Sequence, residues 1–272
     1  KNRNARIMSE LSSLASSLPV TEGSSIFVCA DDSRPDVLKA LITGPEGTPY
    51  QNGAFEFDVL LPQDYPHSPP KVHFCTTGNG KVHFNPNLYP CGKVCLSLLG
   101  TWSGPSWEPE RSTLLQVLVS IQALILVDNP WLNEPGMEKT SQARECEAYI
   151  REKRYDTLKT AVLGQINKPP SVFSDIVLEH FSRRSDNIRA QCDEWEAEQA
   201  KVDAEREAEV QKRAAKEKLA QEKAAQKAGQ AGGKAKAKAK GGKASAVQQA
   251  AGWPGMLAWD EYADEMGYGA EM

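Results

Sequence analysis

The stretch with the clearest chemical potential is an Asn-Pro-Asn turn, Asn85-Pro86-Asn87, followed eight residues later by Cys95. Pro86 fixes its own φ and restricts Asn85, so the turn holds the side-chain amide of Asn87 on a stiff backbone. A carbonyl bonded to the Cys95 sulfur would develop negative charge on its oxygen when attacked, and a nearby amide could stabilise that charge. The pattern therefore favours a cysteine nucleophile that forms a thioester, with Asn87 as a hydrogen-bond donor for the attacked carbonyl.

Cys95 also has a second interpretation, because most unpaired cysteines are inert residues of protein cores. In that case the turn is only a polar surface feature beside a structural cysteine, and residues 85–96 are compatible with both readings. Cys91 could form a disulfide with an oxidised Cys95, or it could be an incidental loop cysteine. We expect Tyr89 to be a packing residue. The elements around this stretch must decide between these alternatives.

The composition limits the number of domains and the class of partner. Of 272 residues with a net charge of −4, those from 196 to 250 are mostly Ala, Glu, Lys and Gln, too poor in large apolar groups to form a core. We therefore expect a core domain at 1–167, a helical extension at 168–227 that is solvated beyond about residue 195, and a disordered tail at 228–272. No basic stripe with interleaved aromatic residues is present in the folded part, so no nucleic-acid partner is expected.

The six cysteines lie in a sequence that shows no secretory leader. They are typical of reduced thiols in a cytoplasmic or nuclear protein. No apolar run is long enough to span a bilayer, so no membrane partner is expected. The cysteines and the four histidines lack the spacing of a metal site, and we expect neither a metal nor a cofactor.

The residues before the turn predict one helix and an antiparallel sheet. Apolar residues recur every three or four positions over residues 1–18, which indicates an amphipathic helix that ends at Pro19. Four strand-like runs follow, at Ser25–Ala30, Val37–Thr43, Ala54–Leu61 and Val72–Thr76. The third run alternates apolar with acidic residues, which indicates a sheet with one face in water. Short turns between consecutive strands predict a meander.

The residues after the turn predict mainly helices. Residues 77–111 form a long irregular stretch, which is more often functional than not. Leu114 to Val127 is apolar on nearly all sides and predicts a buried helix. A second helix is expected at 137–167, and a third from about Ser171, whose apolar face should pack on the second. The order of elements predicts an α+β fold.

Five short motifs resemble those of ubiquitin-conjugating enzymes and occur in that family's order. They are the turn and strand at residues 44–55, the proline-rich loop at 65–72, the Asn-Pro-Asn turn, residues 92–96 and residues 107–109. Each motif is weak alone, but five in order over about residues 1–165 are specific. The sequence departs from the family at Asn85, where histidine is usual and has a mainly structural role.

Further residues resemble one branch of that family, the giant inhibitor-of-apoptosis type that combines conjugating and ligase roles. They lie at 94–99, 101–102, 115–122, 133–136 and 191–195. The resemblance implies the ubiquitin-conjugating fold: an N-terminal helix, a four-stranded antiparallel meander, an active-site loop, a buried central helix and C-terminal helices. A helical extension and a tail would follow.

The implied chemistry has two steps. Cys95 would accept ubiquitin as a thioester from a ubiquitin-activating enzyme and pass it to a lysine of a protein substrate. Asn87 would stabilise the oxyanion of the second step. Asn133 corresponds to a position at the gate of the active site, where a small polar residue orients the lysine, although it could equally be a residue of a turn between helices.

The candidate partner-binding residues are Lys1, Arg3, Arg6, Pro66, His67 and Pro109. The first three make the start of the first helix basic, which suits either solvent or an acidic partner. The other three correspond to positions where small members of the family bind ring-type ligases. His67 replaces an aromatic residue there and Glu108 a small neutral one, which is unfavourable for an apolar interface. A separate ligase is thus a possible partner rather than a required one.

Two other functions fit parts of the pattern. Inactive relatives on the same scaffold bind ubiquitin without bonding to it, but they lack the cysteine that this chain has. A cysteine hydrolase would need a histidine base, and only His83 lies near the loop.

Overall fold

The computed structural model describes residues 3–137 and 143–231 of the chain, with the backbone alone from 225 to 231. Lys1 and the expected tail beyond residue 231 therefore lie outside the described residues. The chain divides into two units, residues 1–208 and 209–272, and the fold below is that of the first unit.

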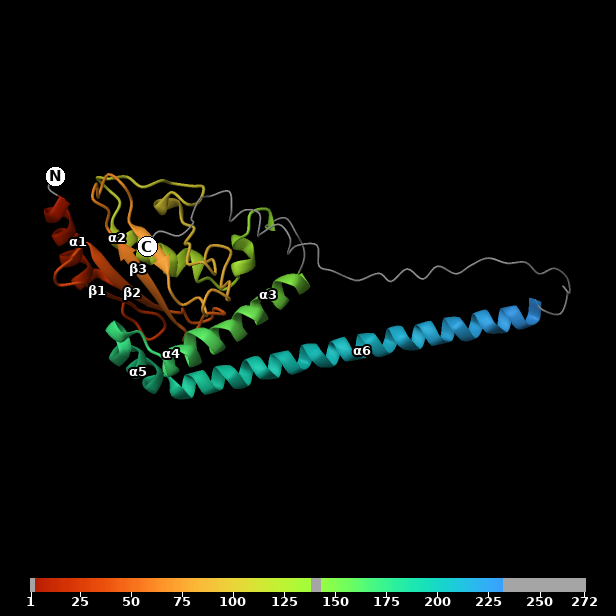
Figure 1. Ribbon diagram of the computed structural model, residues 1–272. Coiled ribbons are helices and arrows are strands. Elements are labelled where there is room, and N and C mark those ends of the chain that lie inside the picture. Colours follow the sequence, from red (N-terminus) through yellow and green to blue (C-terminus); the bar gives the residue numbers. More distant parts are fainter. Residues whose placement is uncertain (1–2, 138–142, 232–272) are drawn as a thin grey trace. The chain divides into compact units, whose positions relative to one another are not determined.

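The sheet is an antiparallel meander, as predicted from the sequence (Figure 1). Helix α1 (Arg3–Ser17) precedes strands β1 (Ile26–Ala30), β2 (Val37–Thr43), β3 (Ala54–Leu60) and β4 (Lys71–Phe74), which pair in sequence order. Phe57 on β3 lies opposite Ala40 on β2 and Phe74 on β4. This register places the phenylalanines of β3 on one face, toward the main core.

Helix α2 (Leu114–Ser120) is the central buried helix and packs into that same core (Figure 1). Thr113 and Gln116 form a capping box that starts it. The helix continues as a π-helical turn, η2 (Ile121–Ile125), and the amide of Leu126 closes this turn by donating to the Ile121 carbonyl. The helix predicted through Val127 therefore ends two residues earlier, because this wider turn takes up its last residues.

The segment from Ala143 to Asn167 is one helical run with a π-helical middle. It comprises α3 (Ala143–Asp156), the π-helical η5 (Thr157–Leu163) and α4 (Gly164–Asn167). The helix predicted for 137–167 is described only from residue 143, since 138–142 lie outside the described residues. Pro169 and Pro170 follow its end, as their missing amide protons require.

The predicted third helix is two helices. A short 3₁₀ turn, η6 (Ser171–Phe173), leads into α5 (Ser174–Arg183), and α6 (Ser185–Ala231) follows. Arg184 separates them with a backbone at φ −94° and ψ 5°, which is outside the helical region.

The apolar face of α5 covers the second face of the sheet. Val177 and Phe181 of α5 form a second cluster with Leu41 of β2, Ala54 of β3 and Val162 of η5. The helix thus packs on its predecessor, as expected, through Val162 of η5, and it also packs on the sheet. The expectation of a wet second face holds only in part: Glu56 and Asp58 point there, but Leu41 and Ala54 are fully buried under the helix.

A polar cluster fastens the extension to the turn before β3. The side chain of Asn52 donates to Asn187 at 2.7 Å and to Gln191, and it accepts from Arg184 at 3.0 Å. His180 contacts the carbonyl of Asn52 at 3.0 Å. Asn52 and Gln191 are almost fully buried, so the residues up to at least Gln191 pack against the core domain.

Candidate active site

Asn85 anchors the Asn-Pro-Asn turn in the core. Its side chain is fully buried and donates to the Tyr50 hydroxyl at 3.0 Å and to the Ile125 carbonyl at 2.8 Å, while its oxygen accepts the Asn87 amide proton at 2.8 Å. The Tyr50 hydroxyl in turn donates to the carbonyl of Phe84. The first residue of the turn is therefore structural and fixes the direction in which Asn87 leaves the core.

Asn87 and Cys95 lie side by side. The Cys95 amide donates to the Asn87 carbonyl at 2.9 Å, and the side-chain nitrogen of Asn87 donates to the Cys95 carbonyl at 2.9 Å. Asn87 is 6% exposed, and its side-chain oxygen accepts no hydrogen bond. The amide that was predicted to act at the reaction centre thus lies on the backbone of Cys95, the predicted nucleophile, where it also holds the two segments together.

Cys95 lies between two residues that pack in the core. Val94 and Leu96 on either side of it belong to the main core, and Thr101 fastens both by accepting from the Leu96 amide and donating to the Val94 carbonyl. Burial raises the pKa of the Cys95 thiol, while the charge of Lys93 and a hydrogen bond from Tyr89 oppose that rise. At neutral pH Cys95 is therefore mostly a protonated thiol in its resting state.

Tyr89 lies beside Cys95, and the sequence did not single it out as functional. Its hydroxyl hydrogen-bonds to Cys95, and its ring packs on His83 with 5.2 Å between ring centroids. Burial, followed by the charge of Cys95, raises the pKa of Tyr89 to about 12, so the hydroxyl keeps its proton and can donate it to sulfur. The only signal in the sequence was an aromatic residue six positions before the cysteine, which is equally typical of packing.

Asn133 ends the 3₁₀ turn η3 (Pro130–Asn133). Its side chain donates to the Leu124 carbonyl at 3.1 Å and, more weakly, to Asn85 at 3.4 Å. These contacts fit a residue that ties the turn to the end of the central helix, and a gating role stays a prediction. The next residue, Glu134, is half-buried and its charge acts on the hydroxyl of Tyr89, while burial raises the pKa of its carboxyl.

The arginines of α1 are engaged within the fold. Arg3 donates to the carbonyls of Leu61 and Pro62 and pairs with Asp36 at 3.0 Å. Arg6 pairs with Glu10 and donates to the Ser112 carbonyl at 2.6 Å. Whether their remaining surface meets a partner stays a prediction, as it does for Lys1, which lies outside the described residues.

Glu10 is a buried carboxylate that joins three parts of the molecule. One oxygen accepts from the Tyr65 hydroxyl at 2.8 Å and from Arg6, and the other accepts from the amide of Leu114 at 3.0 Å, at the start of the central helix. A carboxylate at a helix N-terminus also interacts favourably with the helix dipole. The network fixes α1 and the proline-rich loop against the helix that follows the active-site loop.

The proline-rich loop and the residues near Pro109 form one surface. The indole nitrogen of Trp107 donates to the carbonyl of Pro66 at 2.6 Å, and the Trp107 ring packs on Tyr65. His67 and Glu108 are exposed beside them. The structure thus brings Pro66, His67 and Pro109 to the same region, while a partner for it stays a prediction.

His83 is poorly suited to act as a base. Burial, followed by the charge of Lys153, lowers its pKa to about 4, so the ring is neutral and weakly basic at physiological pH. Efficient general bases have a pKa near the working pH. The geometry therefore does not favour the cysteine hydrolase.

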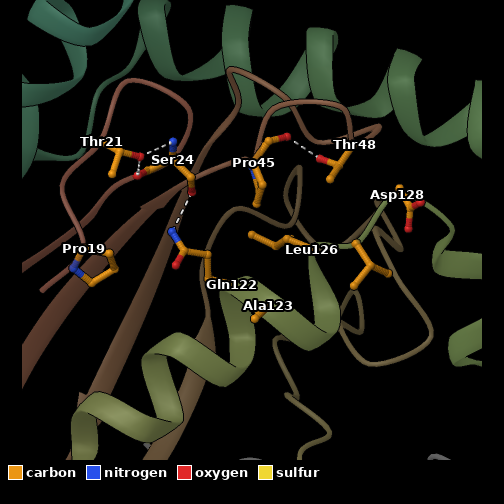
Figure 2. Close-up of a pocket in the computed structure, with 10 residues that line it drawn as sticks. Pro19, Thr21, Ser24, Pro45, Thr48, Gln122, Ala123, Leu126 and Asp128 are labelled. Atoms are coloured by element: carbon orange, nitrogen blue, oxygen red, sulfur yellow. Dashed lines mark hydrogen bonds between the residues drawn. The ribbon is translucent and has the colours of Figure 1, made fainter.

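An open groove of about 460 Å³ lies elsewhere on the core domain (Figure 2). The turns near Ser24 and Pro45 and the end of the central helix line it, and Gln122 crosses it to donate to Ser24 at 2.6 Å. Neither Cys95 nor Asn87 is among its lining residues. Within the described part of the chain, no cluster of side chains could hold a metal and no helix could cross a membrane.

Residues 6–159 match the family model described as ubiquitin-conjugating enzyme. The chain belongs to the ubiquitin-conjugating enzyme family. Over 206 residues, 72% of this chain, it is 49% identical to the human dual E2 ubiquitin-conjugating enzyme/E3 ubiquitin-protein ligase BIRC6, of which the match covers 4%. The predicted resemblance to the family and to its giant hybrid members is thereby confirmed.

Smaller relatives match over a similar length of this chain. Identity is 46% over 202 residues to the probable ubiquitin-conjugating enzyme protein 17 of Caenorhabditis elegans, covering 72% of this chain and 28% of the relative. It is 44% over 204 residues to the putative ubiquitin-conjugating enzyme E2 38 of Arabidopsis thaliana, covering 72% and 60%. The chain thus spans only part of these relatives' lengths.

Proposed function

We propose that Cys95 accepts ubiquitin as a thioester from a ubiquitin-activating enzyme and passes it to the amine of a substrate lysine. The observation that carries this proposal is the environment of Cys95. In a fold of the conjugating family, the Asn87 side chain donates to the Cys95 carbonyl at 2.9 Å, and a hydrogen bond from Tyr89 opposes the rise in the pKa of the Cys95 thiol.

The charging step exchanges one thioester for another. The Cys95 sulfur forms a bond to the ubiquitin carbonyl carbon, the bond to the activating enzyme's sulfur breaks, and the thiol proton leaves to solvent or to the departing sulfur. Because a thiolate replaces a thiolate, the free-energy change is small and no strong base is needed. Burial opposes the thiolate of Cys95, so the Lys93 charge and the Tyr89 hydroxyl are the groups that support it.

The transfer step asks more of the site, because an amine attacks and a tetrahedral oxyanion must be stabilised. The Asn87 nitrogen lies 2.9 Å from the Cys95 carbonyl oxygen, which belongs to the same residue as the reacting sulfur. Rotation of its side chain would turn the donor toward an acyl oxygen on that sulfur. Removing one such donor costs about 10²–10³ in rate in well-studied enzymes.

The hybrid character is the finer part of the proposal. The human relative is named as a dual conjugating enzyme and ligase. In this chain, exposed His67 and Glu108 make the surface beside the proline-rich loop polar, which disfavours an apolar ligase interface. We infer that this chain recruits protein substrates without depending on a ring-type ligase, and that it works in the cytoplasm or nucleus.

Charging can be tested by incubating the chain with activating enzyme, ATP and ubiquitin and separating the products without reducing agent. The expected product is one thiol-sensitive adduct that is absent from Cys95→Ala and becomes thiol-resistant in Cys95→Ser, where an oxyester forms. Cys91→Ala is the matched control and should charge like the unaltered chain. If no thiol-sensitive adduct forms, or if it persists in Cys95→Ala, the proposal is wrong.

A further inference from the structure

Lys153 of α3 is a charged residue that is almost completely withdrawn from water. Its side chain is 3% exposed, and its ammonium group donates to the carbonyl of His83 at 2.6 Å, to Glu152 at 2.9 Å and to Asp156 at 3.1 Å. An ammonium group has three protons, so each proton has an acceptor. A buried charge is unfavourable unless it is paired in this way. These three partners fix the position of the Lys153 side chain.

One contact of Lys153 holds the chain just before the Asn-Pro-Asn turn. The carbonyl that it binds belongs to His83, two residues before the turn begins at Asn85. The next carbonyl, that of Phe84, accepts from the Tyr50 hydroxyl, to which the Asn85 side chain also donates. Three consecutive residues that lead into the turn are therefore held in place, and Lys153 holds the first of them.

A displacement of His83 would reach two groups beside Cys95. The His83 ring packs on Tyr89, with 5.2 Å between the ring centroids, and a hydrogen bond from Tyr89 acts on the Cys95 thiol. The Asn-Pro-Asn turn, which begins two residues later, carries Asn87, whose side chain donates to the Cys95 carbonyl. The contact between Lys153 and His83 thus supports the side of the site that holds both hydrogen-bond donors.

A second contact of Lys153 leads to η3, the turn that ends at Asn133. The Lys153 nitrogen lies 5.0 Å from the centre of the Tyr149 ring, and such cation–π contacts are stronger when the cation is desolvated. The Tyr149 ring packs on Trp131 of η3 in a T-shaped arrangement, with 5.5 Å between the ring centroids. Within the described residues, the Tyr149 hydroxyl and the Trp131 indole nitrogen are buried without a hydrogen bond, so packing of the rings joins α3 to η3 here.

We infer that Lys153 is a positioning residue for the transfer of ubiquitin to lysine, because it holds the His83 segment and the η3 turn at a fixed separation. The inference rests on the proposed thioester. An attacking amine must approach the thioester carbonyl in one geometry, and a misplacement of about 1 Å can lower the rate about 10²-fold. An apolar side chain of similar size could fill the volume of Lys153, but it could not bind the His83 carbonyl.

The test compares charging and transfer in Lys153→Met, which keeps the length of the side chain and removes the ammonium group. Transfer is followed in the full chain as the loss of preformed thioester on addition of free lysine, and it should slow at least about tenfold. The initial rate of charging should change less than about twofold, because exchange between thiolates needs no aligned amine. Lys159→Met is the matched control. Lys159 is exposed on the same helical run, with its nitrogen 5.4 Å from the centre of the exposed Tyr155 ring, and its replacement should change neither rate.

A second pair of variants tests the link through Tyr149. Tyr149→Leu removes the ring between Lys153 and Trp131 and should slow transfer without slowing charging. Tyr149→Phe removes only a hydroxyl that makes no hydrogen bond within the described part of the chain, so both rates should stay unchanged. If the two residues act in sequence, Lys153→Met combined with Tyr149→Leu should slow transfer no more than Lys153→Met alone. Effects that multiply would contradict this link.

Two measurements separate positioning from a general loss of stability. Phe181→Ala truncates a buried ring in the second cluster, which contains none of the site residues, and should destabilise the domain by a comparable amount in urea titrations while transferring normally. Burial, followed by the charge of Lys153, lowers the pKa of the His83 ring to about 4. Titration of this ring by NMR should therefore give a higher pKa in Lys153→Met and an unchanged pKa in Lys159→Met.

Several results would overturn the inference while leaving the proposed function intact. They are unchanged transfer in Lys153→Met, equal slowing of charging and transfer, an equal loss of transfer in Phe181→Ala, or an unmoved pKa of His83. If Lys153→Met does not fold, normal transfer in Tyr149→Leu would overturn the inference instead. Absence of any thioester on the unaltered chain would refute the proposed function, and this inference with it.

Discussion

Replacing Asn87 with alanine separates the two roles that its amide can have. In the resting structure it donates to the Cys95 carbonyl at 2.9 Å and is 6% exposed. Deleting it leaves a buried carbonyl without that donor, which costs about 1–3 kcal/mol of unfolding free energy. A domain stable by about 5–15 kcal/mol survives that loss, so the variant should fold and can be assayed.

The catalytic role predicts a change in the rate of transfer rather than in stability. If the Asn87 nitrogen stabilises the oxyanion of the transfer step, its loss raises that barrier by about 2.7–4 kcal/mol, or 10²–10³ in rate. Charging should change little, since thiolates are good nucleophiles and good leaving groups and their exchange makes less demand on such a donor.

The assay measures the two steps apart. Charging is followed as the initial rate of thiol-sensitive adduct, and transfer as the loss of preformed adduct on addition of free lysine. Asn87→Asp, which keeps the size but removes the donor, should repeat the defect of Asn87→Ala. Thr101→Val, which removes the hydrogen bonds to Leu96 and Val94, is the control for loosening the segment around Cys95. If both steps fall by the same factor in Asn87→Ala, the residue only holds the loop and the argument for the oxyanion is refuted.

Three further results are expected. Glu10→Ala leaves Arg6 without its carboxylate and should lower the unfolding free energy by about 3–5 kcal/mol in urea titrations. Glu10→Gln should cost less, and equal losses in the two variants would contradict a charged network. Tyr89→Phe removes the hydrogen bond that favours the thiolate, so the pKa of Cys95 should rise and its alkylation profile should move to higher pH; an unmoved profile would refute that bond. Gln191→Ala should speed amide exchange in the first turns of α6 while β2 and β3 stay protected; an equal increase of exchange in the strands would contradict a contact that anchors only the extension.

The strands and the central helix could be predicted because their signals are local. The alternation of apolar and acidic residues on β3 and the apolar surface of α2 both indicate packing in one core. In the structure both elements contribute residues to the main core. The second cluster was harder to foresee. Leu41 and Ala54 read as ordinary strand residues, and only the position of α5 shows that they are covered. The break at Arg184 was equally hidden, since no helix-breaking residue marks it; in the structure the Arg184 side chain donates to Asn52.

The site itself could be predicted in part. Asn87 and Cys95 were proposed as a pair from their spacing, and in the structure the Asn87 side chain donates to the Cys95 carbonyl. Tyr89 was missed as a hydrogen-bond partner because its reach to the sulfur depends on the pairing of Leu88 with Val94. The sequence singled out Asn133 as a candidate for the gate position and did not single out its neighbour Glu134. Asn133 binds the Leu124 carbonyl, whereas the charge of Glu134 acts on Tyr89.

The burial of Cys95 has consequences for both steps. A thiol with a raised pKa is a poorer leaving group, so a thioester on Cys95 should react more slowly with amines and water than one on an exposed cysteine. Such a carrier persists until the sulfur is helped to leave. Tyr89 and Lys93 lie where they stabilise the thiolate, which appears in charging and in discharge alike, whereas Asn87 lies where it can stabilise oxygen. Loss of Tyr89's hydroxyl should therefore slow both steps, and loss of Asn87's amide chiefly the second.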